Sequence, residues 1–265
     1  MSPELMFWFA LATKMAITAL FVSVATIMAE RLGAAVGALV ATLPVSAGPV
    51  YVFLALDHDA SFISASAVVS LALNAATAIF VTVYVLVAQR RSLWISVSLA
   101  FTAWLAATLA LGPVQWTAAS AFLLNAVVFA LCVFIVEPFS LVRVPPTTRP
   151  WHDFVVRAGI VTLLVGAVLT LSFRIGPAGS GVLAVIPVIY MSIMVILHPR
   201  VGGPGTAAVL ANAIPGLAGF GAALLTLHLI AVPLGSTLAL IVALGVSVAW
   251  NAAIYATRRC SRGHD

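Results

Sequence analysis

The sequence predicts an all-α integral membrane protein with about nine transmembrane helices, and three observations carry that prediction. The composition is 63% hydrophobic and only 7% charged, whereas a soluble domain is about 25% charged. The apolar runs are about 20 residues long, the length that a helix needs to cross a hydrocarbon core of ~30 Å. The basic residues behind the net charge of +5 are scattered between these runs. That placement is typical of membrane topology, so we expect no nucleic-acid partner.

Short polar connections divide the chain into nine expected spans. The break between the fourth and fifth spans, at Gly112 and Pro113, is tight, so a count of eight stays open. The spans cover residues 7–29, 34–56, 62–88, 93–111, 115–136, 154–173, 178–198, 205–231 and 235–256.

The distribution of lysine and arginine predicts the orientation. If the N-terminus is outside, Arg174 is the one arginine in the outer segments, and the other loop arginines lie on the cytoplasmic side. A Lys/Arg excess marks the cytoplasmic face. We therefore expect an N-out, C-in, multi-pass protein of the bacterial inner (cytoplasmic) membrane, with the lipid bilayer as a partner. The cytoplasmic arginines would be Arg31, Arg90, Arg91, Arg143, Arg149, Arg200, Arg258, Arg259 and Arg262.

An internal repeat organises the chain. Informative residues recur 143 positions later in the same order, which predicts a first four-helix repeat in 1–111 and a second in 154–265. The segment 112–153 supplies a connecting span and a loop. Because this connector crosses the membrane once, the second repeat should be inverted relative to the first. The alternative is chance similarity between two Ala/Val/Leu-rich segments. The recurring pairs are Lys14 and Arg157, Arg31 and Arg174, Gly33 and Gly176, and Pro44 and Pro187.

Each half also carries a short motif pattern: a basic residue after the first span, a Gly-rich second helix with a central proline, and a tryptophan followed by paired alanines. With this pattern each half resembles the small four-span membrane proteins of the GlpM and DUF3147 type. The resemblance covers both repeats but neither the connector span nor the loops, and it implies architecture rather than substrate. The residues are Arg31, Gly33, Gly37, Pro44, Trp104, Ala106 and Ala107, then Arg174, Gly176, Pro187, Trp250, Ala252 and Ala253.

The two central prolines are the first candidates for a substrate site. Pro44 and Pro187 fall near the middle of the second and seventh spans. A proline frees backbone polar groups, which are tolerated in a membrane only against protein or a water-filled cavity. Both interruptions should therefore face inward, with the hydroxyls of Ser46 and Ser192 beside them. A purely structural kink is the alternative.

Two asparagines at membrane depth extend this site. Asn74 lies in the third span and Asn212 in the eighth, at roughly equivalent repeat positions. A buried amide must find a partner, so each either joins helices or lines a cavity. If both line a cavity, they should converge on one pseudo-symmetric substrate site. We expect Asn125 to be a helix-packing residue.

Three further residues complete the candidate set. Lys14 either snorkels to the outer interface or faces inward, and an inward Lys14 would favour an anionic solute. Trp104 and Trp250 end matching repeat units and are either packing residues or substrate platforms. All seven acidic residues fall at span ends, in loops or in the tail, which argues against coupling through a buried carboxylate.

These patterns predict a secondary-type transporter of a small organic solute that works by alternating access, as a uniporter or exchanger. We expect no enzymatic activity, no cofactor and no metal site, and the sequence makes no prediction of oligomeric state. Two alternatives stay open. One is a non-transporting component of an envelope biosynthetic or regulatory complex, with a tightly packed interior. The other is an intramembrane lipid-handling protein, with a gap that opens to the bilayer.

Overall fold

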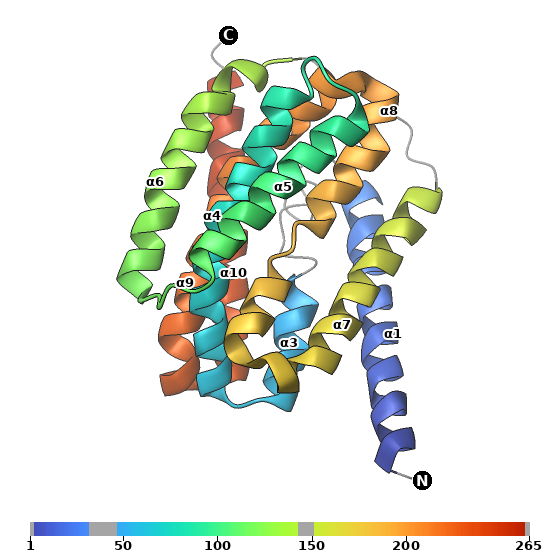
Figure 1. Ribbon diagram of the computed structural model, residues 1–265, viewed down its shortest axis with the longest axis vertical. Coiled ribbons are helices and arrows are strands. Elements are labelled where there is room, and N and C mark those ends of the chain that lie inside the picture. The colour runs from blue at the N-terminus through green and yellow to red at the C-terminus, as the bar shows by residue number, and fades with distance from the viewer. Residues whose placement is uncertain (1–2, 32–46, 143–150, 263–265) are drawn as a thin grey trace.

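The computed structural model describes residues 3–31, 47–142 and 151–262, and every regular element in these ranges is a helix. Most helices run along the long axis of the molecule; α1 begins at one end and α10 ends at the other (Figure 1). Five helical segments in the described ranges are long and apolar enough to cross a membrane, which indicates a multi-pass membrane protein. They are Ala60–Val87, Leu93–Leu111, Ala118–Phe139, Ala158–Leu234 and Ser236–Thr257.

The first half of the chain forms helices with well-defined starts. Asp59 caps α4 by accepting a hydrogen bond from the Phe62 N–H at 2.8 Å, and Thr117 and Ser120 form a capping box at α6. These caps mark the starts of α4 and α6. The elements are α1 (Pro3–Arg31), α3 (Ala47–Asp57), α4 (Ala60–Val87), α5 (Leu93–Leu111), α6 (Ala118–Val136) and the short 3-10 turn η1 (Glu137–Phe139).

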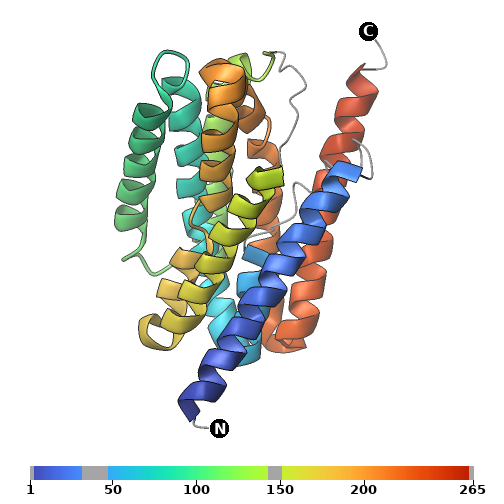
Figure 2. The same ribbon diagram turned by 90° about the vertical axis from the view of Figure 1, so that its right-hand side faces the viewer.

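The second half consists of α7 (Trp151–Ala184), α8 (Val188–Ala211), α9 (Ile214–Leu234) and α10 (Ser236–Arg262). Glycines with positive φ interrupt α7 at Gly176 (φ 67°) and α8 at Gly202 (φ 75°), and the chain changes direction sharply at both (Figures 1 and 2). Glycine adopts this conformation without the steric cost that a side chain brings. The apolar segment 158–234 is therefore several helical limbs rather than one rod.

A helix is also interrupted at Pro187, as the sequence predicts. The helix ends at Ala184 and resumes at Val188, and Pro187 has φ −77° and ψ 44°. Proline has no N–H to continue the helical ladder. Pro44, which lies 143 positions earlier in the sequence, and Ser46 lie outside the described residues.

Helix α4 lies at the centre and packs against α5, α6, α7, α8 and α9. Most of its side chains are buried on all faces. Around it, α1 packs on α7 and α10 packs on α9. Figure 1 shows α1 and α10 at separate places in the bundle, although they overlap in the view of Figure 2.

Helix starts recur at the spacing of the sequence repeat. The start of α4 at Ala60 corresponds to Gly203, directly after the break in α8, and the start of α5 at Leu93 corresponds to the start of α10 at Ser236. Each pair is 143 positions apart. On this spacing, α3 corresponds to the limb of α8 that precedes Gly202.

Candidate functional site

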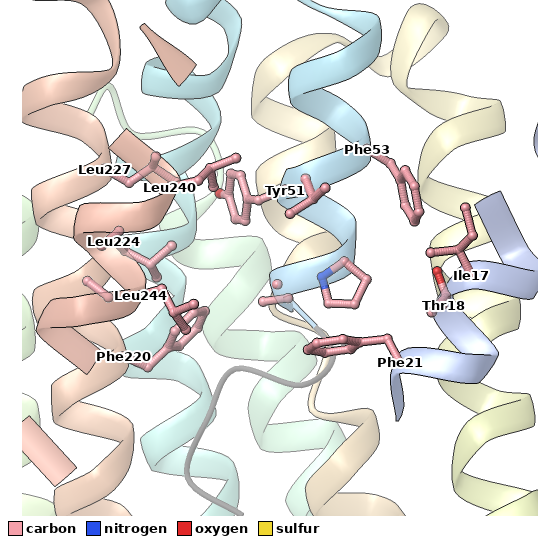
Figure 3. Close-up of a pocket in the computed structure, with 16 residues that line it drawn as sticks. Ile17, Thr18, Phe21, Tyr51, Phe53, Phe220, Leu224, Leu227, Leu240 and Leu244 are labelled. Atoms are coloured by element: carbon pink, nitrogen blue, oxygen red, sulfur yellow. The ribbon is translucent and has the colours of Figure 1, made fainter. Parts of the chain in front are cut away.

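A partly open pocket of about 330 Å³ lies between α1, α3, α9 and α10, and Figure 3 shows the side chains that line it. This volume is at the lower end of the range for small-ligand pockets, about 300–1,000 Å³. The first turn of α3 borders it, and aromatic and aliphatic side chains from the four helices point into it. Prominent lining residues are Ile17, Phe21, Phe53, Phe220, Leu224 and Leu244. We call this region, with its four helices, the open quarter.

The described lining of the pocket has only two polar side chains, and both already have hydrogen-bond partners. The Thr18 hydroxyl donates to the Lys14 carbonyl at 2.9 Å. The Tyr51 hydroxyl lies 2.6 Å from Ser70 Oγ, which in turn donates to the Gly181 carbonyl at 2.8 Å. With both hydroxyl hydrogens engaged, the described side chains of the lining offer apolar contact and no free hydrogen-bond donor to a polar solute.

A charged pair lies at one end of the pocket. Lys14 of α1 forms an ion pair with Asp57 at the end of α3, and each side chain is 20% exposed. Lys14 Nζ is 6.0 Å from the ring centroid of Phe53, which lines the pocket. Lys14 therefore neither stands free in a cavity nor extends alone to the interface, because Asp57 neutralises it.

Beside this pair, the turn between α3 and α4 is fixed to α7. The His58 Nε2 atom is 2.9 Å from Ser172 Oγ, and the His58 ring stacks on Phe62 at 3.8 Å between centroids. Partial desolvation lowers the pKa of His58 below its usual range, although Asp57 and Asp59 oppose the shift. The pKa of Asp59 is also lowered, chiefly because the Phe62 N–H donates to its carboxylate.

The region related to the open quarter by the 143-residue spacing is formed by α4, α5, α7 and α8. There Phe80, Tyr84 and Met194 are fully buried in one cluster with Ala100. Tyr84 of α4 also bonds to His198 of α8, with 2.7 Å between the hydroxyl and Nδ1. We call this region the packed quarter.

The structure places Asn74 at a junction of α4, α6 and α9. Its Nδ2 donates to Asn125 Oδ1 and to the Leu217 carbonyl, both at 3.2 Å. Asn125 Nδ2 donates to the Leu71 carbonyl at 2.6 Å. Gly221 makes room for the amide, since a Cβ there would lie 2.9 Å from Asn74 Nδ2. Asn74 is thus hydrogen-bonded to Asn125, a residue that the sequence analysis predicted to have only a helix-packing role.

Asn212 lies at a different junction. It caps α8, and its Nδ2 donates to the Ser140 and Ala208 carbonyls at 2.9 Å. Asn74 and Asn212 share none of these partners, so the structure does not bring the two amides to one site.

The other candidates form local contacts. Ser192 donates to the Ile189 carbonyl at 2.7 Å, Trp104 is buried beside Phe101, and Trp250 donates to the Pro215 carbonyl at 2.9 Å. None of the candidates that the structure describes lines the pocket. The lining segment of α3, which contributes Pro49, Tyr51, Val52 and Phe53, follows directly after the Pro44 region in the sequence. Its apolar letters are common to every span, so only its closeness to the expected break could have marked it.

No protein-family model matches the chain, and neither the curated proteins nor the solved structures contain a significant match. The resemblance of each half to the GlpM and DUF3147 type therefore stays a prediction.

Proposed function

We propose that the protein is a secondary-type membrane transporter of a small organic solute, working by alternating access between two inverted four-helix repeats. The single observation that carries this proposal is the difference between the two quarters. The open quarter has a pocket between its helices, whereas in the region related to it by the 143-residue spacing α4, α5 and α8 contribute to one buried cluster. An alternating-access transporter built from inverted repeats has this asymmetry in any one state.

The proposal includes nine crossings in an N-out, C-in arrangement. The positions of the breaks support it: Gly176 and Gly202 divide α7 and α8 where the sequence expects connections between spans. The opposite placement of the start of α1 and the end of α10 is what an odd number of crossings requires (Figure 1). In the bacterial inner membrane, the positive-inside rule then gives the orientation.

The placement of acidic residues supports uniport or exchange rather than cation-coupled pumping. Asp57 is paired with Lys14 at the end of α3, and Asp59 caps α4. Glu137 lies at the end of α6. These are positions at helix ends, whereas coupling carboxylates usually stand within the membrane interior.

Distance measurements between spin labels test the proposal directly. Ile17 and Leu244 stand on opposite sides of the open quarter and are both about half exposed. Their equivalents at the repeat spacing, Ile160 and Phe101, belong to the packed quarter. After replacement of Cys132 and Cys260 by serine, each pair is converted to cysteines, labelled and measured in nanodiscs by pulsed electron paramagnetic resonance.

We expect two distance populations for each pair, and conditions that shorten the 17–244 distance should lengthen the 160–101 distance. A control pair at Leu229 and Leu238, on the packed helices α9 and α10, should keep one distance. One narrow, unchanging distance for both test pairs would instead favour the envelope-complex component, which does not need to move.

An intramembrane lipid-handling protein is the second candidate function. The observation that favours it is a partly open, apolar pocket lined by α1 and α10, two helices that do not pack extensively on each other in the described structure (Figure 3). It predicts a permanently open 17–244 pair, without reciprocal movement of the 160–101 pair.

A further inference from the structure

We infer that the pocket of the open quarter binds the alkyl chain of a membrane amphiphile, which enters from the bilayer between α1 and α10. This inference names the ligand class of the proposed transporter. That the ligand is transported rests on the proposed function. The binding step itself depends only on the pocket.

The lining determines the chemistry of the occupant. Both described hydroxyls of the lining are engaged with protein partners, as described above. A polar solute entering the pocket would give up hydrogen bonds to water and would find no free hydrogen-bond donor among the described lining side chains, which is costly. An alkyl chain loses nothing of this kind, and it packs against side chains such as Leu224 and Leu227.

The route of access follows from which helices flank the opening. On one side stands α1, which packs on α7, and on the other stands α10, which packs on α9. Leu20 and Ile241, near the pocket residues Phe21 and Leu244, are each more than 60% exposed. These exposed apolar side chains suit contact with hydrocarbon rather than with water, so the opening continues into the lipid phase.

The polar end of the same ligand has a place to lie. Phe53 lines the pocket and also stands beneath Lys14 Nζ. Lys14 and Asp57 lie about one helical turn beyond the lining residues Thr18 and Phe53 on their helices. A chain in the pocket can thus direct its head group to a paired cation and anion. A neutralised pair selects weakly by head-group charge, so chain length should dominate recognition.

Two glycines that are free to accept a side chain provide a matched test. A Cβ at Gly48, which lines the pocket, meets no atom within 4 Å, and neither does a Cβ at Gly245, which lies on α10 outside the lining. Gly48→Phe should fill the pocket without a backbone clash. Gly245→Phe adds the same side chain on the same flank of the molecule and leaves the pocket open.

The probes are two photoactivatable C16 amphiphiles with a diazirine near the methyl end, one a carboxylate and one an amine. They are crosslinked to the full-length protein in nanodiscs, and the labelled peptides are mapped by mass spectrometry. The readout is labelling at Leu224 and Leu227, which are almost fully buried and line the pocket, relative to labelling at Phe134, which is 75% exposed on α6.

We expect both probes to label the buried α9 positions in wild type and in Gly245→Phe, and several-fold less in Gly48→Phe. Unlabelled palmitate should compete, and octanoate should compete poorly. Labelling that follows exposure alone and is equal in all three proteins would mean ordinary lipid contact and would overturn the inference. Loss of only one probe would show that the head group, not the chain, decides binding. If the 17–244 and 160–101 distances change reciprocally but the C16 probes do not label the pocket, the transporter proposal is supported and only the alkyl-chain ligand is excluded.

Discussion

The open quarter and the packed quarter have helix starts that correspond at a spacing of 143 positions, but they differ in the side chains on α9 and α4. In the packed quarter, α4 presents Phe80 and Tyr84, both fully buried. At the equivalent positions of the open quarter, α9 presents the smaller Ala223 and Leu227, which line the pocket. The comparison teaches that local side-chain volume decides which of two regions with corresponding helix starts encloses a cavity.

This difference also bears on mechanism. In the packed quarter, the bond between Tyr84 and His198 joins α4 to α8. The equivalents of these two residues are Leu227 and Ala55, which offer no such bond. The proposed cycle therefore exchanges an open and a closed state between halves that are not equally stable when closed. The following predictions test this inequality.

The largest expected effect is at Phe80. Phe80→Ala should lower the free energy of unfolding by about 3–5 kcal/mol, because it opens a cavity in a fully packed cluster. The reverse change in the open quarter, Ala223→Phe, should cost much less, since the new ring enters existing space. Thermal or denaturant unfolding in detergent measures both. Equal losses would show that the two quarters are packed alike.

Glycine substitutions should reproduce the contrast on a smaller scale. A Cβ at Gly203 would lie 1.9 Å from the Ala88 carbonyl oxygen, so α8 and α4 must move apart in Gly203→Ala. We expect a loss of about 1–3 kcal/mol, as for overpacking in general. Gly48→Ala in the open quarter meets no atom within 4 Å and should be neutral or slightly stabilising. A loss at Gly48 as large as that at Gly203 would contradict the open pocket.

The third prediction concerns the amides that the sequence placed in one site. Asn74→Ala removes the donor to Asn125 and Leu217 inside the protein, and should cost about 1–3 kcal/mol. Asn212→Ala affects a helix end near η1 and should cost less. Unfolding of both variants, with and without C16 amphiphile, separates the roles. If both variants abolish stabilisation by the amphiphile and neither unfolds earlier, the amides form a ligand site after all.

The smallest expected effect is a pH dependence at His58. Its pKa is lowered in the folded protein, so between the unfolded and folded pKa values the unfolded chain binds more protons. The contribution of His58 to stability is therefore complete above about pH 6.5 and is lost as the pH falls through the lower folded pKa. The melting temperature of wild type should fall more between pH 7.5 and 5 than that of His58→Gln. Identical slopes would show that His58 does not contribute.

Much of the layout could be predicted from local sequence. The helix breaks at Pro187, Gly176 and Gly202 result from the backbone preferences of proline and glycine, which act within a few positions along the chain. The expected connections of the second half, 174–177 and 199–204, accordingly contain the glycines at which α7 and α8 are interrupted.

The candidate site was less predictable. Lys14 meets Asp57 across 43 positions, and Asn74 meets the Leu217 carbonyl across 143. Which residues become contact partners depends on the rotation of each helix about its axis and on the angle at which it crosses its neighbour. The apolar residues of a span do not specify these angles. The sequence therefore predicted a substrate site built around polar residues. The pocket of the open quarter instead lies among apolar side chains.

By itself, then, the sequence determined that the chain is helical and apolar enough for the membrane, and where its helices break. These properties depend on hydropathy summed along the chain and on the backbone limits of glycine and proline. Only the tertiary structure decided which helices meet, which polar groups pair and where space remains. Those outcomes depend on side-chain volume compared across helices distant in sequence, as between Phe80 and Ala223.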